Sequence, residues 1–204
     1  MRPSASITTA MPYNPDAHRR RSIRLPGYDY AQPGAYFVTI CTQDRAILLE
    51  RPDVQETISY WWNALPPKFP NLETDAFVVM PNHIHGILTF VGAAPRGRPV
   101  AGQPHGVAPT LGDVVGWFKT MTTNAYIRGV KDRAWPPFDR RLWQRNYYEH
   151  VIRTDDDLDR IRQYILDNPA RWGYDHDNPL GQPDRDETAF WETLGPGEAH
   201  LPRG

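Results

Sequence analysis

The sequence has 204 residues, of which 40% are hydrophobic and 12% aromatic, enough for one domain with its own core. Its longest apolar runs are strand-sized and too short to cross a bilayer, and the N-terminal region lacks the apolar segment of a signal peptide. Cys41 is the single cysteine, which excludes an internal disulfide. We therefore expect a cytoplasmic protein with no membrane partner.

Charge is unevenly distributed along the chain. The formal net charge is -1, but residues 175–204 hold seven acidic and two basic side chains, so residues 1–174 carry a balance of +4. Arginine outnumbers lysine 20 to 3. The planar guanidinium suits phosphate oxygens, which favours a nucleic-acid partner. A GC-rich genome is an alternative source of the arginine bias.

The first half of the chain predicts one helix and three strands. Residues 1–18 are expected to be disordered, and His18–Arg24 forms a basic arm. The β-rich and apolar-periodic segments that follow are a strand at Tyr36–Thr42, a helix at Asp53–Ala64, and strands at Ala76–Met80 and His83–Phe90. Pro81-Asn82 is a dipeptide typical of tight turns, so the last two strands are expected to form a hairpin.

The second half predicts helix, strand and helix. Residues 92–109 are rich in Gly, Pro and Ala and are expected to form a loop. The predicted elements after it are a helix at Leu111–Arg128, a strand at Tyr147–Arg153, and a helix from Thr154 to about Asn168. Thr154 is an N-cap that is followed by acidic residues, and Pro169 ends the helix. Residues 175–204 are expected to be a loose, polar, acidic tail.

The order strand–helix–strand–strand–helix–strand is typical of an α+β, ferredoxin-like fold. Such a fold has an antiparallel sheet with helices on one face. The C-terminal helix is an addition to that pattern. The opposite face of the sheet is then free to carry a site.

His83-Ile84-His85 is the first candidate site. Side chains two apart on a strand point the same way, so both imidazoles project from one face while Ile84 faces the core. Two convergent imidazoles are metal ligands that need at least a third. Gly86 is expected to leave room beside them. The alternative is two unrelated polar residues on a solvated strand face.

Tyr164 and Asn168 are the second candidate. Residues four apart lie one helical turn from each other, so the Tyr164 phenol and the Asn168 amide share a face. The amide oxygen is able to complete a metal site. The alternative is a half-buried tyrosine on an amphipathic helix, with Asn168 as a residue of the helix end.

A stretch rich in arginine and aromatic residues suits single-stranded DNA, because cations bind phosphates and rings stack on bases. Together with the basic arm, it gives these expected DNA contacts: Arg19, Arg20, Arg21, Arg24, Arg140, Arg141, Trp143, Arg145 and Arg153. A solvated loop is the alternative. Tyr126, Tyr147 and Tyr148 have no partner at metal-ligand spacing and are expected in the core or against DNA, and His150 is expected to be structural or to contact DNA.

These motifs together resemble the HUH single-tyrosine transposases, and most closely the REP-associated tyrosine transposases of bacteria. The resemblance extends from Arg19 to Trp172. It is carried, in order, by Arg20–Leu25, Gly27–Tyr30, Tyr36–Thr39, Met80–Gly86, Trp143-Gln144, Tyr147–Arg153, Tyr164-Ile165 and Asn168-Pro169.

The resemblance implies a transposase domain at residues 19–174, with Tyr164 as nucleophile, His83 and His85 as metal ligands, Asn168 as the third ligand, and magnesium or manganese as the metal. It implies cleavage and rejoining of single-stranded or hairpin DNA, including REP-type palindromes, through a 5′-phosphotyrosine. The chain is then a monomer or homodimer that is associated with the nucleoid when bound to DNA. Alternatives are a non-catalytic hairpin-binding protein, a rolling-circle HUH nickase, and a phosphodiesterase that uses water.

Overall fold

A four-stranded sheet forms the centre of the computed structural model, which describes residues 33–92 and 109–194. The strands are β1 (Gly34–Cys41), β2 (Leu72–Val79), β3 (His83–Phe90) and β4 (Tyr148–Ile152). They lie in the order β2-β3-β1-β4, and each neighbouring pair is antiparallel. The predicted ferredoxin-like α+β fold is therefore confirmed.

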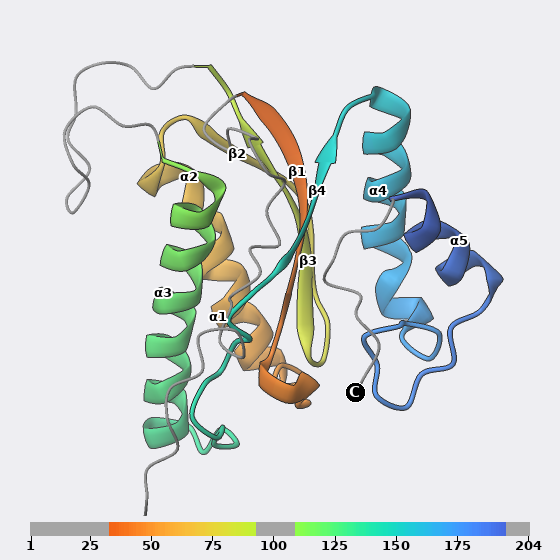
Figure 1. The fold of residues 1–204 in the computed structure, drawn as a ribbon. Coiled ribbons are helices and arrows are strands. Elements are labelled where there is room, and N and C mark those ends of the chain that lie inside the picture. The colour runs from red at the N-terminus through yellow and green to blue at the C-terminus, as the bar shows by residue number, and fades with distance from the viewer. Residues whose placement is uncertain (1–32, 93–108, 195–204) are drawn as a thin grey trace, which may run out of the picture.

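Helices cover both faces of this sheet (Figure 1). On one side lie α1 (Pro52–Asn63), α2 (Leu65–Lys68) and α3 (Leu111–Asp132). On the other lie α4 (Asp155–Asp167) and α5 (Arg185–Thr193), and two 3-10 turns, η1 (Gln43–Arg45) and η2 (Asn168–Arg171), complete the elements. The predicted C-terminal helix, α4, thus packs on the face opposite the other predicted helices.

Alternation along the strands divides the core in two. Tyr36, Val38 and Ile40 of β1 belong to the larger apolar cluster with α1 and α3. Phe37, between them, belongs to the smaller cluster with Ile161, Ile165 and Trp191. Successive strand residues point to opposite faces, so a sheet packed on both sides needs apolar residues at consecutive positions.

The predicted helix starts are also found. Thr110 accepts a hydrogen bond from the backbone N–H of Asp113, and the Asp113 carboxylate accepts one in return, which forms a capping box. Thr154 accepts from the N–H of Asp157 at 3.1 Å, and three aspartates fill the first turn of α4. These negative charges stabilise the positive end of the helix.

Gly86 has a different role from the expected one of leaving room beside the histidines. A Cβ at this position would lie 2.4 Å from the ring of Trp62, which packs on the α1 side of the sheet. The glycine therefore admits a tryptophan into the larger core, and the two histidines on the other face gain nothing from it.

The end of the chain also differs from the expectation of a loose tail. Residues 175–194, called the C-terminal segment below, follow η2, and their helix α5 lies beside α4 (Figure 1), with the Trp191 ring near that of Phe37 in β1. Asp175, Asp177 and Trp191 are buried there. The expected disordered residues 1–18, the basic arm to Arg24 and most of the predicted loop at residues 92–109 lie outside the described residues. Within residues 33–92 and 109–194, no helix is long and apolar enough to span a membrane.

Candidate metal and tyrosine site

His83 and His85 point to the same face of β3, as their spacing predicts. Their Nε2 atoms lie 2.9 Å apart, and both side chains are fully buried. Ile84, between them, packs in the larger core on the opposite face. The prediction of convergent imidazoles is confirmed, but the expectation of an open sheet face is wrong, because α4 and the C-terminal segment cover the pair.

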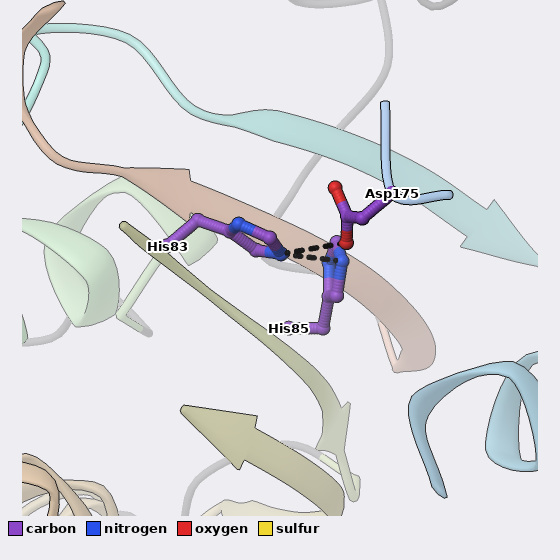
Figure 2. Close-up of side chains that lie close together, drawn as sticks. All are labelled: His83, His85 and Asp175. Atoms are coloured by element: carbon purple, nitrogen blue, oxygen red, sulfur yellow. Dashed lines mark hydrogen bonds and ion pairs between the residues drawn. The ribbon is translucent and has the colours of Figure 1, made fainter. Parts of the chain in front are cut away.

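Hydrogen bonds to Nδ1 orient both rings. Nδ1 of His83 lies 2.8 Å from Oδ1 of Asn82, and Nδ1 of His85 lies 2.8 Å from Oγ1 of Thr39. Each imidazole therefore turns its Nε2 toward the other (Figure 2). Burial lowers the pKa of His83 to about 4, so this ring is neutral near pH 7 and able to offer a lone pair.

Asp175 is the third group beside the imidazoles, and no sequence pattern pointed to it. Its Oδ2 lies 3.5 Å from Nε2 of His83, and one ligand atom from each of His83, His85 and Asp175 lies within 4.8 Å of the others (Figure 2). Burial, followed by the negative charge of Asp177, raises the pKa of Asp175 to about 7. A buried carboxylate that lacks a full set of donors is a group that a cation would stabilise.

Asn168 is buried one turn after Tyr164. Its backbone N–H donates to the Tyr164 carbonyl at the end of α4, which confirms the predicted spacing. Its Oδ1 and Oδ2 of Asp175 are buried oxygen atoms without a hydrogen-bond donor among the described residues. The Asn168 amide also interacts with the Asp175 carboxylate. Two imidazoles, a carboxylate and an unpaired amide oxygen fit a divalent ion such as manganese or magnesium.

Tyr164 lies beside the histidines. Its ring centroid is 5.3 Å from that of His85, and its face stacks on Phe190 of α5 at 3.6 Å with an interplanar angle of 6°. The hydroxyl donates to Oε1 of Glu187 at 3.0 Å. Burial, together with the charge of Glu187, raises the pKa of Tyr164 well above its usual range. In this arrangement Tyr164 is a protonated phenol.

Glu187 ties the C-terminal segment to the site. Besides the Tyr164 hydroxyl, its Oε1 accepts from Nε1 of Trp191 at 2.8 Å. With Asp175 and His176 it forms a second group whose ligand atoms lie within 4.8 Å of one another. Acidic residues beyond residue 174 thus enter the site that the sequence assigned to earlier residues.

Two further contacts hold the C-terminal segment in place. Nε of Arg45 donates to Oδ1 of Asp177 at 2.7 Å, across the end of β1. Nδ2 of Asn82 donates to the Asp177 carbonyl at 2.8 Å. The segment is therefore anchored next to Asp175 by a charged pair and by a buried amide.

The expected DNA contacts divide into exposed and buried residues. The described arginines among them are exposed: Arg140, Arg141, Arg145 and Arg153. Trp143 is buried in the larger core, and its Nε1 donates to Oγ1 of Thr122 at 2.8 Å. Its ring cannot stack on a base, so the structure corrects the expectation for this residue. Arg19, Arg20, Arg21 and Arg24 lie outside the described residues.

The remaining tyrosines and His150 take structural positions. Tyr126 is fully buried, and the single hydrogen of its hydroxyl is within reach of two carbonyls, those of Leu48 and Pro136. The other two tyrosines lie in different cores. Tyr147 packs against the larger core, and Tyr148 is buried in the smaller one. His150 pairs with Asp157 at 2.9 Å, which joins β4 to the start of α4. Two kinds of role were expected for the three tyrosines and His150, a structural one or a DNA contact, and these positions agree with the structural one.

A ferredoxin-like sheet with a His–hydrophobe–His pair on one strand, beside a tyrosine on a following helix, is the arrangement on which the resemblance to the HUH single-tyrosine class rests. Comparison with known proteins confirms the resemblance to REP-associated tyrosine transposases. A Haemophilus influenzae protein described as a "Putative REP-associated tyrosine transposase" is 27% identical over 149 residues, which cover 72% of this chain and 76% of that protein. No family model matches the sequence.

The chain belongs to the family of a second Haemophilus influenzae protein. That protein is uncharacterized and is 34% identical over 179 residues, which cover 80% of this chain and 95% of the relative. Among solved structures, a REP-associated tyrosine transposase bound to a REP hairpin has the same fold. It aligns with a TM-score of 0.52 and 23% identity, over 74% of each chain.

Proposed function

We propose that this protein is a metal-dependent DNA strand transferase that cuts and rejoins single-stranded or hairpin DNA through Tyr164. The observation that carries the proposal is the position of the Tyr164 ring, 5.3 Å from that of His85, beside a buried group of side chains that could hold a metal ion. The relative whose structure contains a REP hairpin supports hairpin DNA as the substrate. Such a protein works in the bacterial cytoplasm, on the nucleoid.

The proposed reaction exchanges one phosphoester for another. Oη of Tyr164 forms a bond to phosphorus while the bond from phosphorus to the 3′-oxygen breaks, which leaves a 5′-phosphotyrosine and a 3′-hydroxyl. The phenol gives up its proton and the leaving 3′-oxygen takes one up. Rejoining is the reverse attack by a 3′-hydroxyl, and it needs no further energy source because the phosphoester is conserved.

His83, His85, Asn168 and Asp175 are the proposed holders of the metal. When bound, a magnesium or manganese ion neutralises the charge of the scissile phosphate and orients it. An ordinary tyrosine has a pKa of about 10 and is a weak nucleophile, so position has to supply much of the rate. Tyr164 lies beside the histidines of its own chain, which supports cleavage in cis.

Substrate access requires the C-terminal segment to move. His83, His85, Asn168 and Asp175 are each at most 1% exposed, so a phosphate cannot reach them while the segment lies over the site. The contacts that have to open are those of Arg45 with Asp177 and of Tyr164 with Glu187. We therefore assign the described arrangement to the closed form of the enzyme.

Covalent adducts test the proposal. Hairpin oligonucleotides with single-stranded flanks are incubated with the protein and manganese and then separated on denaturing gels. We expect a protein–DNA adduct that Tyr164→Phe abolishes while binding persists, because only the nucleophilic oxygen is removed. Tyr60→Phe is the matched control, since Tyr60 is an exposed helix tyrosine. Adducts that survive Tyr164→Phe would move the nucleophile elsewhere.

The same assay separates the alternatives. A water-using phosphodiesterase cuts without forming an adduct, and a non-catalytic hairpin-binding protein binds without cutting. A rolling-circle nickase forms the same adduct but acts at an origin sequence. His83→Ala and His85→Ala are expected to remove metal-dependent cleavage. Because both residues are buried, their melting temperatures are measured without metal to separate the loss of ligation from the loss of folding.

A further inference from the structure

The orientation of the Asn82 side-chain amide is fixed by its hydrogen bonds. It is fully buried in the turn between β2 and β3, and its Nδ2 lies 2.8 Å from the Asp177 carbonyl and 3.2 Å from the Arg45 carbonyl. Both carbonyls are acceptors only, so Nδ2 donates to each and uses both of its hydrogens. Rotating the amide by half a turn would bring Oδ1 against two carbonyl oxygens. Oδ1 of Asn82 therefore faces His83.

This fixes the tautomer of His83. An amide oxygen accepts only, so the 2.8 Å contact with Oδ1 requires a hydrogen on Nδ1 of His83. A neutral imidazole carries one N–H, so a hydrogen on Nδ1 leaves Nε2 without one. Nε2 of His83 then bears a lone pair, directed at the point that His85 and Asp175 share.

His85 is held by a different kind of group. Its Nδ1 lies 2.8 Å from Oγ1 of Thr39, and a hydroxyl is able either to donate or to accept. The 2.9 Å contact between the two Nε2 atoms needs one hydrogen, and that of His83 is already on Nδ1. With His85 in its neutral form, its hydrogen is therefore on Nε2, and Thr39 donates to Nδ1. The hydrogen bonds run in one direction, from Thr39 through His85 and His83 to Asn82.

We propose that Asn82 and Thr39 are positioning residues with different tasks. Asn82 holds His83 permanently in the tautomer that exposes a lone pair at Nε2, whereas Thr39 allows His85 to exchange tautomers. In the metal-free site His85 donates to His83. For both rings to bind a metal, His85 loses the hydrogen from Nε2 and gains one on Nδ1, and the Thr39 hydroxyl turns to accept it. The inference rests on the proposed metal site.

Nitrogen NMR tests the tautomers directly. In protein labelled with ¹⁵N-histidine, without metal at pH 7.5, we expect His83 with hydrogen on Nδ1 and His85 with hydrogen on Nε2. Saturating magnesium, which is diamagnetic, should move the hydrogen of His85 to Nδ1 and leave His83 unchanged. Spectra of His83→Ala and His85→Ala assign the signals. A His83 signal with hydrogen on Nε2 in the metal-free protein would overturn the inference.

Manganese affinity, measured by calorimetry, tests the two tasks. Thr39→Val keeps the shape but cannot accept a hydrogen bond, so we expect affinity to fall about tenfold or more, as is usual when a metal ligand is deprived of its hydrogen-bond partner. Thr39→Ser keeps the hydroxyl and should bind like the wild type. Asn82→Ala should lose about tenfold or more and allow His83 both tautomers. Equal affinity of the Val and Ser variants would refute the role of Thr39.

These measurements need no DNA, so a negative result for the tautomers can be distinguished from a negative result for the proposed function. The expected tautomers without any manganese binding would refute the metal site and leave the assignment of hydrogens intact. Expected tautomers and manganese binding without adducts would refute only the strand transfer. If Asn82→Ala does not fold, the wild-type spectra still decide the tautomer of His83.

Discussion

The hydroxyl of Tyr164 donates a hydrogen bond to Oε1 of Glu187 at 3.0 Å, so a carboxylate from the C-terminal segment holds the proposed nucleophile. The carboxylate is buried, and its negative charge adds to the effect of burial in keeping the phenol protonated. Attack on phosphorus requires instead that the phenol oxygen is released from this contact and able to lose its proton. This contact therefore opposes the reaction as long as it is intact.

Glu187→Gln is expected to speed adduct formation. The amide preserves the shape and the hydrogen-bond acceptor but removes the charge, and hydrogen bonds to charged groups are stronger by about 1 kcal/mol. Because about 1.4 kcal/mol corresponds to a factor of ten, we expect a rate increase of severalfold, up to about tenfold. Single-turnover adduct formation, measured across a range of pH, checks this.

Glu192→Gln is the matched control for this variant. Glu192 is an exposed residue of the same helix, so its replacement removes a charge without opening the site, and its rate should equal that of the wild type. A slower Glu187→Gln enzyme with an unchanged melting temperature would instead make Glu187 the acceptor of the Tyr164 proton.

Trp143→Ala is expected to destabilise the protein. The side chain is buried and its indole N–H donates to Thr122, so truncation leaves a cavity and removes that hydrogen bond. Large-to-small changes of this kind cost about 3–5 kcal/mol of unfolding free energy. Urea denaturation measures the loss. Trp143→Phe, which retains most of the volume, should bind hairpin DNA like the wild type, and a large loss of affinity in that folded variant would restore a direct DNA contact.

Exposed arginines should set the salt dependence of DNA binding. Arg140, Arg141 and Arg145 lie in the connection before β4, and removing one phosphate contact on single-stranded DNA lowers the slope of log affinity against log salt by roughly 0.7. We expect each substitution by alanine to weaken binding with such a change in slope. Arg133→Ala, at the end of α3, is a comparison outside the predicted set. Unchanged slopes for all three would place the DNA elsewhere on the protein.

Local patterns in the sequence were sufficient for the fold and for half of the site. The apolar, β-rich run at residues 83–90 predicted β3 with its observed bounds, and the alternation of strand side chains placed His83 and His85 on one face. The cap at Thr154 located α4, which fixed Tyr164 and Asn168 one turn apart. These features depend on neighbours within a few residues, which is the range over which period and capping act.

The other half of the site depends on contacts that are distant in the sequence. Asp175 meets His83 from a distant part of the chain, and Glu187 meets Tyr164 across 23 residues. The acidic composition after residue 174 suggested solvent exposure, because charged residues are seldom buried without partners. Here the partners, Arg45 and the imidazoles, come from the sheet, so composition alone could not reveal them. Trp143 was misplaced because its burial, too, depends on a contact distant in the sequence, the one with Thr122.

Asp175→Asn is expected to stabilise the metal-free protein. Between the unfolded pKa of about 4 and the folded pKa of about 7, the folded state binds more protons at this carboxyl, so its contribution to stability falls as pH rises. The lowered pKa of His83 acts in the opposite direction, so the two proteins must be compared at each pH. The gain in melting temperature should be largest above pH 7 and vanish near pH 4.

Manganese provides the second test of Asp175→Asn. If Asp175 serves the metal, the variant that is more stable without metal should bind manganese more weakly and gain less melting temperature from it. The asparagine still accepts the hydrogen bond from the Asp177 N–H, so the local turn is retained. A variant with unchanged manganese affinity would remove Asp175 from the proposed ligands.

Asn168 offers a graded test, because one helix end carries both a proposed ligand and the nucleophile. Its Oδ1 lacks a donor among the described residues and lies in the buried group with Asp175. We expect Asn168→Ala to weaken manganese affinity and slow cleavage without abolishing either, since two imidazoles and a carboxylate remain. Asn168→Gln keeps the amide oxygen on a longer side chain and should retain more activity than Ala.

The competing explanation is that Asn168 only ends α4 before Pro169. In that case the Ala and Gln variants would behave alike, both with normal dependence on manganese, and any loss would appear in the melting temperature of the metal-free protein. Rates of adduct formation titrated against manganese for the wild type and both variants decide between the two roles. A ligand shifts the half-saturating manganese concentration, whereas a residue that only ends the helix leaves it unchanged.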